Sequence, residues 1–294
     1  MNNFGWINNP EAVDEIESEV GVFGSAASSL KDSGKGKIVC LHENFTKIGE
    51  PFAYLNQGRV GSCVSCSTAI QVDTLKAAEI ANGERELYVA QTCAEALYYG
   101  ARVVIGKNRI RGDGAVNAYQ VKYIAEYGTL ARIKYGNLDL TEYSEDRCRK
   151  WGSNSGFPKT LEAISKEHLV LSYARVKSWE ELRDSIANGF PVCVGSPYGF
   201  SSETDDEGFC KQNTSWNHSM TYIAVDDNSS RKGGLLCNSW PRNYLKIRKR
   251  KLNQPDGTFW VDADMVDKHM ANGDAWSISG FQGFKRPIDS KVSW

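Results

Sequence analysis

The sequence has no run of about 18 apolar residues, so we expect no membrane-spanning helix. Its opening residues, Met1-Asn2-Asn3-Phe4-Gly5-Trp6, hold neither a basic segment nor an apolar one, and no secretory signal is expected. Neither sign of charge is in clear excess, because 35 basic and 36 acidic residues leave a net charge of −1. We therefore expect no membrane partner, no general affinity for nucleic acid and a cytoplasmic location.

Cysteine is sparse, with eight residues scattered over 294 positions. This is too few for a dense disulfide scaffold. Cys193 and Cys237 lie within apolar, strand-like runs and are expected to be small buried hydrophobic residues. We expect mostly free thiols and a reducing compartment, although the even number leaves disulfides open.

One segment combines several features of a reactive site. Residues 56–62 form a polar loop with two glycines, and residues 63–78 continue as a good helix former. Cys63 is thus predicted in the first helical turn, where unpaired N–H groups and the helix dipole favour a thiolate. Gln57 lies six residues upstream, close enough to place an amide donor beside the sulfur, as an acyl-transfer oxyanion requires. The segment predicts a nucleophile that still needs a base.

A base is available among the four histidines. His218 enters an apolar, β-prone run, and after a Gly-Gly turn the next run ends in Asn238-Ser239-Trp240. A cysteine on a helix, a histidine on a facing strand and an asparagine that orients the histidine form a generalised catalytic triad. The other three histidines belong to no motif and are expected to be surface or packing residues: His42, His168 and His269.

At these residues the sequence resembles the papain-like cysteine peptidases. The family's Gln-Gly-x-x-Gly-Ser-Cys segment is matched by residues 57–63, its histidine by His218 and its Asn-Ser-Trp by residues 238–240. The separation between Cys63 and His218 is 218 − 63 = 155 residues, slightly beyond the roughly 130–150 typical of the family. The order of the four groups is kept.

The resemblance implies a role for each group. Cys63 would be the nucleophile, His218 the base and then the acid, and Asn238 the residue that orients the histidine. Gln57 and the Cys63 backbone N–H would form the oxyanion hole, with no cofactor and no metal. A peptide or protein would be the substrate. It would be bound by Gly112, Asp113 and Gly114, which lie in a predicted sharp turn at residues 111–114, and by Asn217 and Trp240.

The resemblance also implies the fold. We expect an α+β, papain-like two-lobed protein with a cleft between the lobes. Residues 1–50 are predicted as an N-terminal arm or leader, residues 51–165 as a helical lobe with the nucleophile helix, and residues 166–294 as a β-rich, barrel-like lobe carrying the histidine and asparagine.

Three departures from the family pattern bear on the site. A half-cystine three residues before the nucleophile is replaced by Val60, which indicates a protein without that disulfide. Val64 replaces an aromatic residue and Pro241 replaces a glycine, which changes the expected shape of the cleft. An alternative is therefore a non-enzymatic structural or binding component with the same fold.

The opening segment Phe4-Gly5-Trp6-Ile7 is followed by a proline and resembles the N-terminal arm of bacterial and bacteriophage members. The first 50 residues are too short for a typical inhibitory propeptide. We therefore expect the arm to belong to the mature protein, and the protein to be of bacterial or bacteriophage origin, with the virion as an alternative location.

Local patterns predict the remaining elements. Helices are expected at residues 10–20, 63–80, 87–100, 116–128 and 179–189, and strands at residues 37–41, 169–176, 191–196, 217–225, 235–240, 259–261 and 275–279. Residues 129–165 are interpreted as a connection between the lobes, and residues 200–217 as a polar loop.

Two further patterns have competing interpretations. Cys63 and Cys66 have the spacing of a redox dithiol, but that interpretation leaves His218 and Asn238 without a role. A zinc site built on this pair would need a second pair of ligands, and none follows. The basic residues 245–252 are interpreted as a solvated hairpin or as a docking surface for an acidic assembly partner or nucleic acid.

Overall fold

The computed structural model describes residues 4–84, 86–244, 246, 248–250 and 252–285. The α-helices are α1 Pro10–Val20, α2 Phe23–Ala26, α3 Glu43–Lys47, α4 Cys63–Ala81, α5 Ala94–Tyr99, α6 Asn117–Glu126, α7 Glu145–Gly152, α8 Thr160–Ser165, α9 Trp179–Ala187 and α10 Ala263–Asn272. A 3₁₀ turn spans Ser28–Leu30, and a π-helical turn, Gly100–Ile105, continues α5.

The strands are β1 Ile38–Cys40, β2 Glu86–Leu87, β3 Lys134–Tyr135, β4 Leu138–Asp139, β5 Val170–Arg175, β6 Val192–Thr204, β7 Cys210–Asp226, β8 Gly233–Cys237, β9 Thr258–Asp262, β10 Asp274–Phe281 and β11 Phe284–Lys285. The main sheet has the order β5-β10-β6-β7-β8-β9, and β1 pairs with β7. All its pairings are antiparallel.

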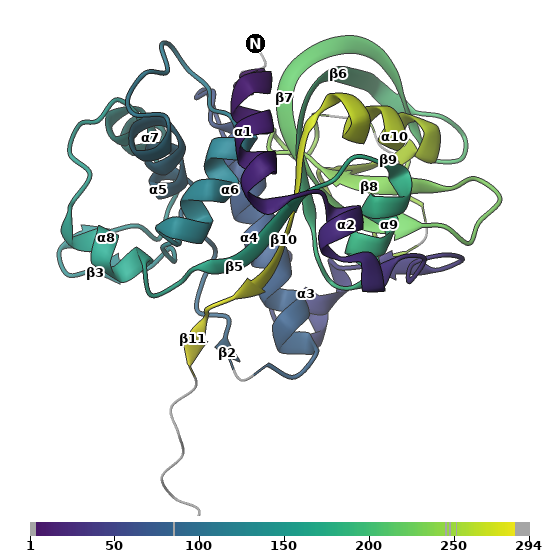
Figure 1. Cartoon of the computed structure of the whole chain (residues 1–294), viewed down its shortest axis with the longest axis horizontal. Coiled ribbons are helices and arrows are strands. Elements are labelled where there is room, and N and C mark those ends of the chain that lie inside the picture. Colours follow the sequence, from purple (N-terminus) through teal and green to yellow (C-terminus); the bar gives the residue numbers. More distant parts are fainter. Residues whose placement is uncertain (1–3, 85, 245, 247, 251, 286–294) are drawn as a thin grey trace, which may run out of the picture.

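Two lobes are evident in Figure 1, where α5, α7 and α8 gather on one side and strands β6 to β9 curl on the other. Helix α4 lies between them and packs on α5 in one lobe and on β7 and β10 in the other. The first 16 residues of this helix are all buried, as expected for a helix enclosed on every side. This mixed, two-lobed architecture confirms the α+β fold class predicted from the sequence.

Polar side chains fix the central helix against the sheet. Gln71 Nε2 donates to the carbonyl oxygens of Pro191 (2.9 Å) and Trp276 (2.8 Å). One turn closer to the helix start, Ser67 Oγ lies 2.7 Å from Ser219 Oγ. Because buried polar groups must be hydrogen-bonded, these bonds set the axial position of α4 relative to the sheet.

The N-terminal segment packs across both lobes. Helix α1 begins at Pro10, with Asn9 Oδ1 accepting from Ala12 N, and it lies against α6 and β5. Strand β1 pairs with β7 in the register Val39 with Val225.

Three predicted segments differ from the structure. The helix expected over residues 87–100 begins only at Ala94, because residues 86–87 pair with β11 as strand β2. The Asp73 carboxylate also accepts from Thr92 N, which holds the chain in a turn just before the helix. The connection over residues 129–165 contains α7 and α8, which were not predicted.

The polar loop expected at residues 200–217 is mostly the extended hairpin of β6 and β7. The polar side chains of this segment predicted a loop, but Phe200, Phe209 and Trp216 are buried. Helix α10 was also missed; it lies between β9 and β10.

Candidate active site

Cys63 is the first residue of α4, as the sequence predicts. The backbone N–H groups of Ser219, Gly5 and Val64 lie against its sulfur. Ser67 and Thr221 hold this end of the helix to β7, since Thr221 Oγ1 donates to the Ser67 carbonyl oxygen at 2.7 Å. The nucleophile predicted on the helix therefore lies directly beside the strand that carries His218.

His218 is oriented by Asn238. The His218 Nε2 atom lies 2.8 Å from Asn238 Oδ1, and because an amide oxygen can only accept, Nε2 carries the proton. The amide is itself held in place, since Asn238 Oδ1 also accepts from Ser239 N at 2.7 Å. The other ring nitrogen, Nδ1, is buried and has no hydrogen-bond partner in the described chain. It is the nitrogen left to take a proton.

Aromatic rings shield this pair of side chains. The Trp240 ring stacks on the His218 imidazole with ring centroids 4.3 Å apart and an interplanar angle of 29°. Trp216 packs edge-on against Trp240 at 4.7 Å. Excluding water strengthens the bond between imidazole and amide, because the local dielectric is low. The structure thus places Trp240 against the histidine.

Gln57 lies next to the same strand end. Its Oε1 accepts from Ser239 Oγ at 2.7 Å, and its backbone N donates to the Ser239 carbonyl oxygen at 2.9 Å. Its Nε2 donates to the Val60 carbonyl oxygen at 2.9 Å, within the loop that leads to Cys63. The four residues expected to form the reaction centre are therefore joined through Ser239 and the 57–63 loop.

Residues 4–7, the only part of the N-terminal segment called the arm from here on, lie across this centre. The backbone N–H groups of Gly5 and Trp6 both donate to the Asn217 carbonyl oxygen at 3.0 Å. On the other side, Ala115 N donates to the Gly5 carbonyl oxygen (2.8 Å), and Ile7 N donates to the Ala115 carbonyl oxygen (2.9 Å). The arm is therefore an extended peptide held by backbone hydrogen bonds from both walls of the cleft.

The arm fits tightly. A Cβ atom on Gly5 would lie 2.0 Å from the Gly61 carbonyl oxygen, so only glycine is accommodated there. The neighbouring Trp6 ring fills a slot at Gly195, where an added Cβ would lie 2.1 Å from the ring. At the end of this slot Trp6 Nε1 donates to the buried carboxylate of Asp274 at 3.2 Å. Backbone pairing and a buried indole together anchor the arm.

Burial controls the charge of Cys63 and His218. Both Cys63 and His218 are 0% exposed. Loss of water raises the pKa of the Cys63 thiol to about 12, although the three N–H groups at its sulfur act in the opposite direction. The same cause lowers the pKa of His218 to about 4, against the smaller opposing effect of Asn238. With the arm in place both groups are neutral at pH 7, so the thiolate expected from the sequence is not present in this closed form.

The predicted substrate turn lies beside the arm. Asp113 Oδ2 accepts from Gly61 N at 3.1 Å, which joins the turn to the loop before Cys63. The Arg102 guanidinium donates to the carbonyl oxygens of Gly112 and Gly114 and holds the turn rigid. Together with Asn217, these residues border the arm, and their role in binding a substrate stays a prediction.

Sequence reasoning missed four residues of this arrangement: Trp6, Ala115, Gly195 and Asp274. Only Trp6 and Ala115 carried a signal, the first within the recognised opening segment and the second directly after the predicted turn. Gly195 and Asp274 lie on β6 and β10, and their register opposite each other appears only in the folded sheet.

The redox interpretation of Cys63 and Cys66 finds no support. All eight cysteines are free thiols. Cys66 is 0% exposed, belongs to the core and lies 3.6 Å from Ser62 Oγ.

Among the described residues of the basic run, four pair with acids of the same chain. The pairs are Lys246 with Glu203, Arg248 with Asp206, Lys249 with Asp256 and Arg250 with Asp226. Residues 245, 247 and 251 lie outside the described part. Among the described helices, none is long and apolar enough to cross a bilayer.

No protein-family model and no curated protein matches this sequence. Solved structures do resemble it. Xylellain, a cysteine protease from Xylella fastidiosa, is 16% identical with a TM-score of 0.57, over 94% of this chain and 91% of that one. Digestive procathepsin L 3 of Tenebrio molitor larval midgut is 17% identical with a TM-score of 0.50, over 92% and 90% of the two chains. Procathepsin B S9 of Trypanosoma congolense is 10% identical with a TM-score of 0.52, over 85% and 77%. The chain therefore has the papain-like two-lobed fold.

Proposed function

We propose that the protein is a cysteine peptidase that the arm keeps latent. The observation that carries the proposal is the arm itself. It is an extended peptide whose backbone bonds to Asn217 and Ala115 while it passes the sulfur of Cys63. A substrate peptide that replaced it would meet the same backbone partners, which recognise polypeptide without regard to side chains.

The proposed reaction assigns one step to each of these groups. Cys63 attacks the substrate carbonyl carbon, forming a carbon–sulfur bond, while its proton passes to His218 Nδ1. The oxyanion is stabilised by Gln57 Nε2 and the Cys63 N–H. His218 then returns the proton to the leaving amine as the carbon–nitrogen bond breaks. Water, deprotonated by His218, then forms a carbon–oxygen bond, the carbon–sulfur bond breaks, and the proton returns from His218 to the Cys63 sulfur.

Hydrogen bonds hold the Gly5 peptide in one position beside the sulfur. The Gly5 N–H lies against the sulfur and also donates to the Asn217 carbonyl oxygen. The Gly5 carbonyl oxygen accepts from Ala115 N. The arm is therefore fixed at both its N–H and its carbonyl oxygen while it covers Cys63.

A bacterial or bacteriophage origin, cytoplasmic or in a virion, is part of this proposal. Its support is the resemblance of the opening segment Phe4-Gly5-Trp6-Ile7. A virion assembly partner bound through residues 245–252 is a further part, supported by the basic composition of that run.

A thiol-directed, peptide-like epoxide tests the proposed function. We expect it to label Cys63 once per chain after the arm is displaced, and mass spectrometry of the digest identifies the cysteine. A Cys66→Ala variant should be labelled equally, since Cys66 faces the core. If displacement of the arm leaves Cys63 unlabelled, or if labelling occurs without hydrolysis of any peptide in a broad library, the non-enzymatic alternative is favoured.

The oxyanion role of Gln57 gives a second expectation. Gln57→Ala should lower kcat by about 10²–10³, the usual loss for one oxyanion donor, with little change in KM. Ser239→Ala is the matched control, because it removes the bond to Gln57 Oε1 but keeps the amide donor. Steady-state kinetics should therefore show a much smaller loss for Ser239→Ala. Equal losses would mean that Gln57 acts only as a support for the loop.

A further inference from the structure

A second cluster of reactive side chains lies where β1 ends and α3 begins. Cys40, His42 and Glu43 each offer one atom that can bind a metal ion, and these atoms all lie within 4.8 Å of one another. The set combines sulfur, nitrogen and oxygen. From the sequence, His42 was expected only to pack or to face solvent, and no metal was expected.

The imidazole of His42 is held in the form that a metal ligand needs. His42 Nε2 lies 3.0 Å from the Leu252 carbonyl oxygen, which can only accept, so Nε2 carries the proton. In the neutral ring Nδ1 then presents a lone pair. This atom is buried on a side chain only 4% exposed, and the described residues offer it no hydrogen-bond partner. A histidine that binds a metal commonly donates its other N–H to a backbone carbonyl in this way.

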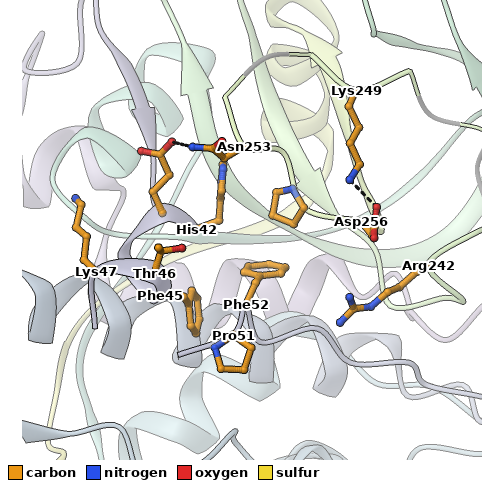
Figure 2. A pocket seen from close by; sticks show the side chains of 12 residues that line it. His42, Phe45, Thr46, Lys47, Pro51, Phe52, Arg242, Lys249, Asn253 and Asp256 are labelled. Atoms are coloured by element: carbon orange, nitrogen blue, oxygen red, sulfur yellow. Dashed lines mark hydrogen bonds and ion pairs between the residues drawn. The ribbon is translucent and has the colours of Figure 1, made fainter. Parts of the chain in front are cut away.

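The other two ligands can adjust. Cys40 is a half-buried free thiol. Glu43 is half-buried too, and its Oε1 accepts from Asn253 Nδ2 at 3.2 Å. His42, Glu43 and Asn253 all help to line a pocket of about 800 Å³, in which Figure 2 labels His42 and Asn253. Two of the three ligand residues therefore border open space, while Cys40 lies outside the lining of this pocket.

We infer that Cys40, His42 and Glu43 bind one zinc-class transition-metal ion. A thiolate and an imidazole select zinc over magnesium or calcium, and three protein ligands with one water complete a tetrahedron. Binding breaks the Cys40 S–H bond, forms a metal–sulfur bond and releases the proton to solvent. Metal–ligand bonds of about 2.0–2.3 Å require the ligand atoms to draw together by about 1 Å, which side-chain rotation supplies.

The ion would also fasten a long surface connection. Leu252 and Asn253 belong to the segment that joins β8 to β9, and they hold His42 and Glu43 respectively. The same segment begins with Asn238 and includes Trp240 of the proposed peptidase site. Metal binding should therefore stabilise this connection, whether or not the protein is a peptidase.

Cobalt titration tests the site. The protein carries Cys63→Ala, so that the thiol of the reaction centre cannot contribute, and it is reduced and freed of metal before Co²⁺ is added. We expect one Co²⁺ per chain, a sulfur-to-cobalt charge-transfer band and displacement by Zn²⁺. Cys40→Ala, His42→Gln and Glu43→Gln should each weaken binding, and the first two by at least the roughly 10–100-fold that loss of a second-shell partner costs. Zn²⁺ should raise Tm only where Cys40 is present.

Cys210→Ala is the control, since this buried thiol lies outside the cluster and should leave affinity unchanged. Glu43→Gln keeps the size and partial exposure of the side chain, so it tests the site even if a change at the buried His42 impairs folding. No bound cobalt, a spectrum without the sulfur band, or equal affinity in Cys40→Ala and Cys210→Ala would each overturn the inference.

Discussion

Replacing Gly5 by valine is expected to raise the alkylation rate of Cys63 by about 10³. The added side chain cannot fit, because even its Cβ would lie 2.0 Å from the Gly61 carbonyl oxygen, which belongs to the backbone and cannot move aside. The arm must leave the cleft, and the sulfur, which is 0% exposed in the closed form, becomes open to reagent. The measurement is the rate of iodoacetamide modification at Cys63, followed by mass spectrometry.

The size of this effect follows from what holds the arm. Four backbone hydrogen bonds contribute about 0.5–1.5 kcal/mol each, and burial of the Trp6 ring contributes about 3 kcal/mol more. The ordering of an otherwise free chain end offsets part of this sum. A net closing free energy of about 4 kcal/mol would leave the cleft open in roughly one molecule in a thousand. If Gly5→Val removes the closed state, all molecules are open instead of one in a thousand. The alkylation rate of Cys63 then rises about a thousandfold.

Asn8→Ala is the matched control for Gly5→Val. Asn8 is an exposed residue just beyond the arm, so its replacement should leave the rate of wild type unchanged. Trp6→Ala should fall between the two, because it empties the slot at Gly195 but keeps the backbone bonds. An alkylation rate in Gly5→Val equal to that of Asn8→Ala would show that the arm does not control access to Cys63.

The sequence predicts those parts of the site whose residues lie close together along the chain. Cys63 at a helix start, and Asn238 at a strand end, follow from a loop–helix pattern and from two β-prone runs joined by a turn. The hydrogen bond between His218 and Asn238 spans only 20 residues within one hairpin. In such cases the spacing along the chain nearly determines the spacing in space.

What the sequence did not predict depends on contacts between distant segments. The arm closes on Ala115, Asn217 and Asp274, which are brought together only by folding of both lobes. His42 lacked any motif because its partner, Leu252, lies 210 residues away. The protonation state of Cys63 was predicted wrongly for the same reason. The helix start favours a thiolate, but burial of the sulfur among distant segments raises its pKa, so the thiol stays protonated.

Two segments were predicted wrongly from their residue patterns. Residues 87–100 have apolar positions at helical spacing, yet the Asp73 carboxylate captures Thr92 and delays the helix to Ala94. The hairpin around residue 205 exposes residues 211–215 without a break, and its buried aromatic residues are spaced too widely to show an alternating pattern.

In the arm-displaced Gly5→Val protein, His218→Ala is expected to lower hydrolysis by about 10⁶, the loss typical of removing one member of a catalytic triad. Cys63→Ala should cost about as much, and the double variant should cost no more than either, because the two groups act as a unit. The measurement is kcat on the same peptide substrate.

The pH profile of Cys63 alkylation distinguishes a catalytic pair from a structural one. In the closed form the Cys63 pKa of about 12 and the His218 pKa of about 4 keep both groups neutral between these values, so reaction is slow at pH 6 and rises only with alkali. Once water enters, the desolvation that caused both shifts is removed. The helix end alone supplies about 0.3–1 kcal/mol, less than one pKa unit, which is too little to ionise the thiol at pH 6.

A His218 imidazolium beside the sulfur can supply several units, as in other histidine-paired cysteines. The Gly5→Val protein should therefore keep reacting at pH 5–6, and the two groups should titrate as a coupled pair. Adding His218→Ala should move the midpoint up toward about 8.5, the value of a free thiol. Asn238→Ala, which leaves the imidazole but not its orientation, should give an intermediate midpoint. If the curves with and without His218 coincide, His218 does not stabilise the thiolate. The proposed reaction would then lack its base.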